Sequence, residues 1–338
     1  MTQNSEAFLA RASLHDWFLH QWYQAETPHS WLLPLESLFR YAVKARQRAY
    51  QSGVRNSVRL PVPVLIVGNI SVGGAGKTPL VIWLAEELTR RGYRPGIVSR
   101  GHGGQNTHTP QRVYPDSDPL SVGDEPVVMA RRTGCPVVVA KKRVEAGRHL
   151  LATTDCTVLI ADDGLQHYAL ARDVEIAVID GLRGFGNGHC LPAGPLREPP
   201  ERLKQVDCVI YNGVGPDGAT LMTLTGDRAI NLADPTLSRP LADFRNQPTH
   251  ALAGIGHPAR FFAHLEEHGL HPERRAFPDH HAYRPDDLHR PADTHLLMTE
   301  KDAVKCGQWA DSHCWYVPVE AMLPPGTADF LHQLLLGT

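Results

Sequence analysis

The sequence predicts an α/β protein with a parallel sheet flanked by helices and a second, smaller α/β domain. From about residue 61, short apolar runs rich in β-branched residues alternate with helical patterns, which is typical of parallel sheets. The chain has 338 residues, more than one domain usually contains, and its 42% hydrophobic and 21% charged residues are ordinary for a globular protein. We expect an N-terminal segment over 1–60, a core domain over 61–212 and a C-terminal α/β domain over 213–338.

The N-terminal segment predicts an interfacial helix. In "WLLPLESLFRYAVKARQRAY" one helical stripe is apolar, formed by Leu35, Leu38, Phe39, Ala42 and Val43. The basic residues that follow have no acidic residue among them: Arg40, Lys44, Arg46, Arg48, Arg55 and Arg59. Five aromatic residues precede them: Trp17, Phe18, Trp22, Tyr23 and Trp31. This pattern suits a helix lying on an anionic membrane surface, and the alternative is a helix packed on its own domain with a solvated basic face.

A glycine-rich stretch, "GNISVGGAGKTP", predicts a phosphate-binding loop (P-loop) like that of P-loop NTPases. An apolar strand, "PVLIVGN", precedes it, and the helical pattern "TPLVIWLAEELTRRG" follows, as this motif requires. We expect the loop residues Gly73, Gly74, Ala75 and Gly76 to direct backbone N–H groups at phosphate oxygens. Lys77 would neutralise the terminal phosphates and Thr78 would hold Mg²⁺. Ser71 stands where the usual motif has its first glycine.

An acidic pair predicts the metal partner of this loop. Asp162 and Asp163 follow the apolar run of "TVLIADDGLQH", which places carboxylates at a strand end. The alternative is an Asp-Gly turn without a ligand. Together with the P-loop, the pair favours a Mg²⁺ site.

Two missing motifs favour ATP and a kinase. The position before the paired glycines is Val72, whereas one class of ATPase switches has a lysine there. GTPases read guanine with an [NT]-K-x-D element, and "TEKD" from Thr299 to Asp302 has its lysine one place late.

Further strands and helices are expected after the P-loop helix. The apolar runs "RPGIVSRG", "CPVVVA", "CTVLIADDG", "VEIAVIDG" and "VDCVIYNG" predict strands of the same sheet. From about Asn212 the composition loosens, and a second unit follows with "HALAGIG", "PARFFAHLEEHG", "THLLMTE", "CWYVPV" and "TADFLHQLLLG" as alternating strands and helices.

Eight short strings occur in order between residues 61 and 306, and together they resemble the tetraacyldisaccharide 4'-kinase family. They are "GNISVGGAGKTP", "SRGHGG", "VGDEP", "ADDGLQH", "PAGPLREP", "AGIGHPARFF", "FPDHHAY" and "TEKDAVK". The resemblance implies two α/β/α domains joined by a short β hinge. It implies transfer of the ATP γ-phosphate to the 4'-hydroxyl of tetraacyldisaccharide 1-phosphate, giving lipid IVA for lipid A. It also places the protein peripherally on the cytoplasmic face of the inner membrane.

The resemblance also implies roles for single residues. Asp124 corresponds to the proposed base, and His280, oriented by Asp279, to its partner. The remaining positions match nucleotide, phosphate and metal contacts: Lys77, Thr78, Asp162, Asp163 and Glu198, with Arg100 and Arg197 as phosphate contacts. His102 departs from the family, where a tyrosine is expected.

Other functions are less favoured by the sequence. A P-loop switch and a kinase with a soluble acceptor are the alternatives. The net charge of −2 gives no general attraction to nucleic acid, and we expect no obligate protein partner. Six scattered cysteines predict reduced thiols rather than disulfides or zinc ligands.

Overall fold

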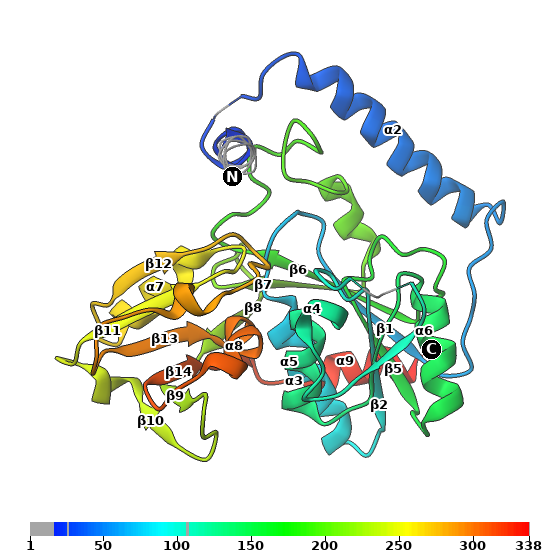
Figure 1. Ribbon diagram of the computed structural model, residues 1–338. Helices are drawn as coiled ribbons and strands as arrows, with labels where there is room; N and C mark the ends of the chain where they lie inside the picture. Colours follow the sequence, from blue (N-terminus) through cyan, green and yellow to red (C-terminus); the bar gives the residue numbers. More distant parts are fainter. Residues whose placement is uncertain (1–16, 26, 106–107, 338) are drawn as a thin grey trace.

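The computed structural model describes residues 17–25, 27–105 and 108–337 and contains two sheets, each in its own lobe (Figure 1). The first sheet has nine strands, and its seven central strands run parallel. In spatial order they are β15 (Glu320–Met322), β8 (Thr220–Thr225), β7 (Cys208–Asn212), β6 (Val174–Asp180), β1 (Val64–Gly68), β5 (Val158–Asp162), β2 (Pro95–Ser99), β4 (Val137–Val139) and β3 (Gln111–Val113). The edge strands β3 and β15 are antiparallel to their neighbours.

The central strands β6, β1, β5, β2 and β4 are buried on both faces, which explains why they read as continuous apolar runs. Leu65 and Val67 of β1 point to one core, and Val64 and Ile66 point to the other. The first core is closed by α3 (Lys77–Arg90), α5 (Asp124–Thr133) and α9 (Thr327–Leu336), and the second by α6 (Arg143–Thr153). The α/β class and the parallel P-loop sheet are therefore as the sequence predicted.

The second sheet has six strands and lies in the smaller lobe. In spatial order they are β10 (Ser238–Pro240), β9 (Arg228–Asn231), β14 (Cys314–Val317), β13 (His295–Thr299), β11 (Thr249–Ala253) and β12 (Glu273–Ala276). One face packs against α7 (Pro258–Glu267) and the other against α8 (Glu300–Cys306). Shorter helices lie between these elements: α4 (Pro119–Val122), η1 (Pro200–Gln205), η2 (Leu241–Phe244), η3 (Pro285–Leu288) and η4 (Gly307–Trp309).

The division predicted at residue 212 differs from the division between the sheets. β8 pairs with β7 in the first sheet, and β15 returns to pair with β8, with Glu320 opposite Thr225. Leu331 and Leu335 of α9 then fill the first core. The second lobe is thus inserted into the first, and the two connecting segments run side by side at β8 and β15.

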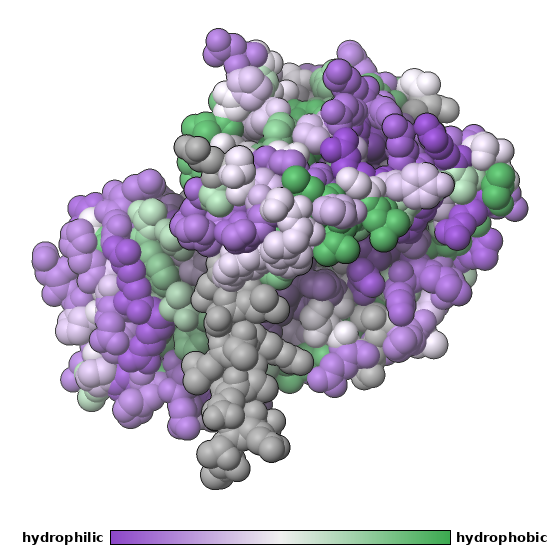
Figure 2. Space-filling view, turned by 90° about the horizontal axis from the view of Figure 1, so that it is seen from above, coloured by the Kyte–Doolittle hydropathy of each residue, from purple (hydrophilic) through white to green (hydrophobic). Residues whose placement is uncertain are grey.

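The helix α2 (Leu32–Gln51) lies along one side of the body, apart from the sheets (Figure 1). Leu32 and Glu36 are buried, and Phe39 is half-buried against the second core. The opposite stripe is open: Leu35 is 47% exposed and Leu38 is 66% exposed. Figure 2 looks onto this side of the molecule, where apolar patches lie among hydrophilic side chains. Within the described residues, none of the helices has the length and apolar character needed to cross a membrane.

Candidate active site

The P-loop follows β1 and ends at the first residue of α3, as the motif predicts. Gly73 and Gly76 have φ angles of 95° and 91°, which residues with a Cβ rarely adopt. A Cβ on Gly76 would also overlap the Asn212 side chain. Two glycines therefore permit the tight turn of this loop, whose residues from Gly73 to Thr78 line the cleft.

The P-loop is braced at both ends. Ser71 pairs with Leu196 in an isolated bridge, so the loop is entered through extended backbone. At the other end, the Asn212 amide donates to the Ala75 carbonyl at 3.1 Å. The Lys77 ammonium donates to Asn69 Oδ1 at 3.1 Å and lies 3.3 Å from Asp163 Oδ1. These contacts hold the P-loop and Lys77 in place at the edge of the first sheet.

The two adjacent aspartates have opposite electrostatic environments. Burial opposes the charge of Asp163, but Lys77 and Arg197 outweigh it and hold its pKa below the usual value. Arg197 donates to both Asp163 oxygens at 3.0 Å. Burial and the carboxylates of Glu125 and Asp163 raise the pKa of Asp162.

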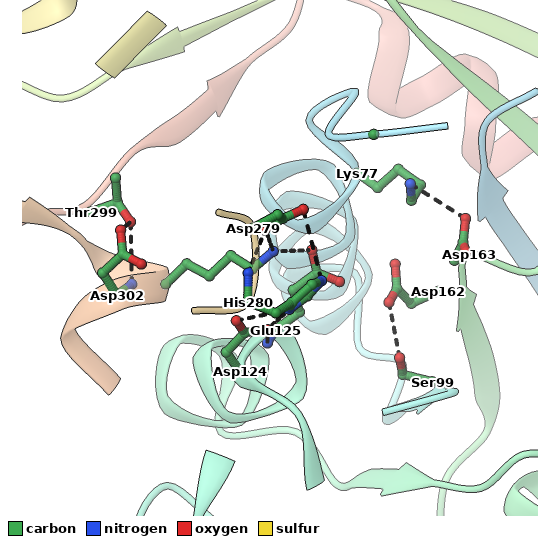
Figure 3. Close-up of polar contacts among 12 residues, drawn as sticks. Lys77, Ser99, Asp124, Glu125, Asp162, Asp163, Asp279, His280, Thr299 and Asp302 are labelled. Carbon is green, nitrogen blue, oxygen red and sulfur yellow. Dashed lines mark hydrogen bonds and ion pairs between the residues drawn. The ribbon is translucent and has the colours of Figure 1, made fainter. Parts of the chain in front are cut away.

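Asp162 also has one oxygen without a hydrogen-bond partner among the described residues. Its Oδ2 accepts from the Ser99 hydroxyl at 3.0 Å, whereas Oδ1 is buried and has no hydrogen bond among the described residues (Figure 3). A buried carboxylate oxygen of this kind is suited to a cation. Thr78 lines the same cleft, so the residues present fit Mg²⁺.

His280 and Asp124 meet across the two lobes. His280 Nδ1 lies 3.1 Å from both carboxylate oxygens of Asp124, the first residue of α5 (Figure 3). Burial raises the pKa of Asp124, but the hydrogen bond from His280 and the nearby Lys301 and Lys305 outweigh it and bring the pKa to about 2. Burial lowers the pKa of His280, and the bond to Asp124 more than compensates, so it is raised.

Asp279 lies next to this pair. Its Oδ1 accepts from the His280 backbone N–H at 3.1 Å, and its Oδ2 lies 3.8 Å from His280 Nε2. His280 has a φ of 58°, a left-handed backbone conformation that residues with a Cβ rarely adopt. Asp279 therefore contacts both the backbone and the ring of His280.

A cleft of about 1100 Å³ contains the P-loop, Asp162, Asp163, Asp279 and His280 among its lining residues. It is also lined by Arg100, His102 and Arg197. The His102 ring stands edge-on to His280, with ring centres 4.9 Å apart. Burial and the neighbouring His280 lower the pKa of His102, which favours its neutral form.

Two residues expected at the site are buried and lie outside the described lining of the cleft. Asp124 is 3% exposed and is not among the described residues that line the cleft, so His280 is the member of the pair that faces it. Glu198 is 2% exposed and lies outside the lining as well. Its two oxygens accept from the Tyr168 hydroxyl and from Gln166 Nε2.

Comparison with known proteins now decides the family. The family model described as tetraacyldisaccharide-1-P 4'-kinase matches residues 28–336. The chain belongs to this family.

Several relatives are similar over most of their length. A tetraacyldisaccharide 4'-kinase from Nitrosococcus oceani is 54% identical over 94% of this chain and 93% of its own. One from Aeromonas hydrophila is 51% identical over 94% of this chain and 95% of its own. Among solved structures, LpxK from Aquifex aeolicus in complex with ATP matches with a TM-score of 0.75 and 26% identity, over 90% of this chain and 98% of that one.

Several residues of the site were not assigned from the sequence. Asn69, Gln166 and Lys301 occur in strings that carry the family resemblance, yet no spacing rule gives them a role. Asn212 ends a strand with no motif around it, and only the folded chain brings it to the P-loop. The signal for the first three was their place in those strings.

Proposed function

We propose that this protein transfers the γ-phosphate of ATP to the 4'-hydroxyl of a tetraacyldisaccharide 1-phosphate, forming lipid IVA in lipid A biosynthesis. The observation that carries the proposal is that one cleft is lined by both the P-loop and His280, the partner of buried Asp124. The first group binds a nucleotide, and the second can take a proton from a hydroxyl. A nucleotide switch needs only the first.

The P-loop residues would position ATP. Backbone N–H groups from Gly73 to Thr78 suit the phosphates, and Lys77 would move from Asp163 and Asn69 to the transferred group. Arg197 and Arg100 would be further phosphate contacts, because both are cationic and both line the cleft. Phosphoryl transfer has a loose transition state, so positioning and charge neutralisation supply most of the catalysis.

Thr78 and Asp162 would hold Mg²⁺, with Asp163 close by. The bound ion would neutralise charge on the β- and γ-phosphate oxygens. Asp162 is the better direct ligand because its Oδ1 has no other partner among the described residues, whereas Asp163 is already paired with Arg197.

The Asp124–His280 pair would accept the proton of the 4'-hydroxyl as the bond to phosphorus forms. His280 lines the cleft, and the bond to Asp124 would keep Nδ1 protonated and leave Nε2 as the accepting nitrogen. Asp124 then stabilises the charged ring. This order reverses the roles expected from the resemblance, in which Asp124 takes the proton itself.

A lipid acceptor agrees with the placement of α2. Arg46 of this helix lines the cleft, while Leu35 and Leu38 on its open stripe face solvent. An apolar stripe beside exposed basic residues suits peripheral contact with an anionic membrane. We place the protein on the cytoplasmic face of the inner membrane, where ATP is available.

The test is transfer of radiolabelled γ-phosphate from ATP to tetraacyldisaccharide 1-phosphate in mixed micelles. Labelled lipid that is formed by the wild type and lost in Lys77→Ala is the expected result. Hydrolysis of ATP without labelled lipid would instead indicate a switch. Neither product would indicate a soluble acceptor.

A further inference from the structure

Lys301 occupies a position between the two lobes that the proposed chemistry does not use. It lies in the first turn of α8, directly after β13, where the Thr299 hydroxyl caps the helix by accepting from the Asp302 N–H at 3.2 Å. Its side chain is 17% exposed and lines the cleft. A lysine so nearly buried is uncommon unless it is paired.

The Lys301 ammonium is paired with both lobes at once. It donates to Asp279 Oδ1 at 3.0 Å in its own lobe and to Glu125 Oε1 at 3.2 Å on α5 in the other lobe. Burial opposes its charge, but Glu125, Asp124 and Asp279 outweigh burial and raise the pKa of Lys301 above its usual value. It therefore remains a cation throughout the physiological range.

Lys305 lies one turn further along α8 and faces the same way, since residues four apart share a helix face. Its ammonium is 3.6 Å from Asp124 Oδ2 and 3.0 Å from Asp302 Oδ1. Two lysines on α8 thus face two adjacent acids at the start of α5. Lys305 is only 5% exposed and is absent from the described cleft lining, whereas Lys301 faces the cleft.

Both partners of Lys301 adjoin the reacting pair. Glu125 follows Asp124, and the Glu125 backbone N–H donates to Asp124 Oδ1 at 2.8 Å. Asp279 precedes His280 and contacts its backbone and ring. A bond from Lys301 to each of them fixes the distance between Asp124 and His280, which come from different lobes.

We propose that Lys301 is a positioning residue for phosphoryl transfer: by joining Glu125 to Asp279 across the cleft, it holds His280 against Asp124. The inference rests on the proposed function. It differs from a phosphate-binding role, in which Lys301 would leave these carboxylates for ATP. It also differs from a purely structural role, in which only stability would depend on it.

The test compares Lys301→Met and Lys301→Arg with the wild type in the labelled-lipid assay, with Lys204→Met at an exposed site as the matched control. Loss of the ammonium should lower kcat by about 10²-fold, since small displacements of reacting groups cost that much. The KM for ATP should stay within about threefold, and arginine, which keeps the charge, should restore most of kcat. A kcat within twofold of the wild type, or a large rise in the KM for ATP, would overturn the proposal.

A double-mutant cycle tests whether Lys301 affects kcat through Glu125. If Lys301 acts through Glu125, the double variant Lys301→Met/Glu125→Gln should be no slower than the slower single variant. Effects that multiply would show that Lys301 acts elsewhere. If Lys301→Met does not fold, the variants Glu125→Gln and Asp279→Asn remove the charge of each partner and keep its side-chain shape. A normal kcat in both variants would refute the bridge from Lys301 to Glu125 and Asp279.

Amide hydrogen exchange separates this proposal from the proposed function. If the wild type forms no labelled lipid, the proposed kinase function is wrong. The bridge from Lys301 to Glu125 and Asp279 would still predict faster amide exchange in the first turn of α5 in the Lys301→Met variant. Unchanged amide exchange in the first turn of α5 would mean that Lys301 does not bridge the two lobes.

Discussion

His280 and Asp124 are 156 positions apart in the chain, yet His280 Nδ1 is 3.1 Å from each oxygen of the Asp124 carboxylate. One residue begins α5 in the larger lobe, and the other follows β12 in the smaller lobe. The contact therefore exists only when both lobes are folded and joined. The contribution of this contact to catalysis and its contribution to the stability of the fold can be tested separately.

Replacing Asp124 by asparagine should lower kcat by about 10²–10⁴-fold, because an amide holds the ring in the wrong tautomer and cannot stabilise its charged form. The KM for ATP should change little, since Asp124 lies outside the described cleft lining. Steady-state kinetics at varied ATP would check this. A defect confined to ATP binding would remove Asp124 from the proton pathway.

The Asp124–His280 bond should stabilise the fold most at low pH. Because the folded pKa of His280 is raised, its contribution is complete below the unfolded value of about 6.5 and is lost as pH rises through the folded value. The lowered pKa of Asp124 keeps that carboxylate charged across this range. The melting temperature of His280→Gln should thus fall further below the wild type at pH 5.5 than at pH 9. His271→Gln, at an exposed site, is the control, and an equal deficit at both pH values would contradict the bond.

The two neighbouring aspartates should respond to substitution with opposite signs in the absence of ligand. A raised folded pKa means that charged Asp162 costs stability above its unfolded value of about 3.9, so Asp162→Asn should melt higher than the wild type at pH 8 and less so at pH 5. Asp163 has a lowered pKa, so its contribution is favourable above that value and Asp163→Asn should melt lower at pH 8. Scanning calorimetry would measure both.

The same variants test the metal assignment. Added Mg²⁺ and ATP should raise the melting temperature of the wild type, because ligands that bind the folded state stabilise it. Asp162→Asn should lose the part of this rise that depends on Mg²⁺. An unchanged Mg²⁺-dependent rise would exclude Asp162 as a ligand.

Replacing Leu35 and Leu38 by serine should weaken binding to anionic vesicles by about 10²–10⁴-fold, since each buried leucine contributes about 1.5–3 kcal/mol. Both side chains are open to solvent, so the fold should be unaffected. Serine at Leu237 and Leu336, which are 52% and 66% exposed elsewhere, is the matched control. Unchanged co-sedimentation of the double variant would show that this stripe does not enter the membrane.

The sequence predicted the parallel sheet and the P-loop because those signals are local. Continuous apolar runs mark strands buried on both faces, and glycines mark the turn before α3. It failed on the division of the lobes, because β8 and β15 are short strands whose pattern does not specify which sheet they join. Only long-range pairing assigns them.

The sequence also could not predict which side chains face the cleft. Glu198 is adjacent to Arg197, yet Arg197 faces the cleft and Glu198 turns toward Tyr168. Asp124 and Asp279 were expected near His280. Whether Asp124 or His280 faces the cleft depends on how α5 packs against α8, which the sequence does not show. The carbonyl and amide contacts of Asn69 and Asn212 likewise have no sequence pattern.

The insertion of the smaller lobe has a consequence for synthesis on the ribosome. The first core needs Ala321 of β15 and Leu331 and Leu335 of α9, which are made after every strand of the second sheet. Since domains tend to fold as units while the chain emerges, the inserted lobe can fold first, whereas the nucleotide-binding lobe is completed only near the end of translation. A nascent chain stalled before residue 320 would therefore carry the His280 side of the site and an unfinished ATP-binding lobe.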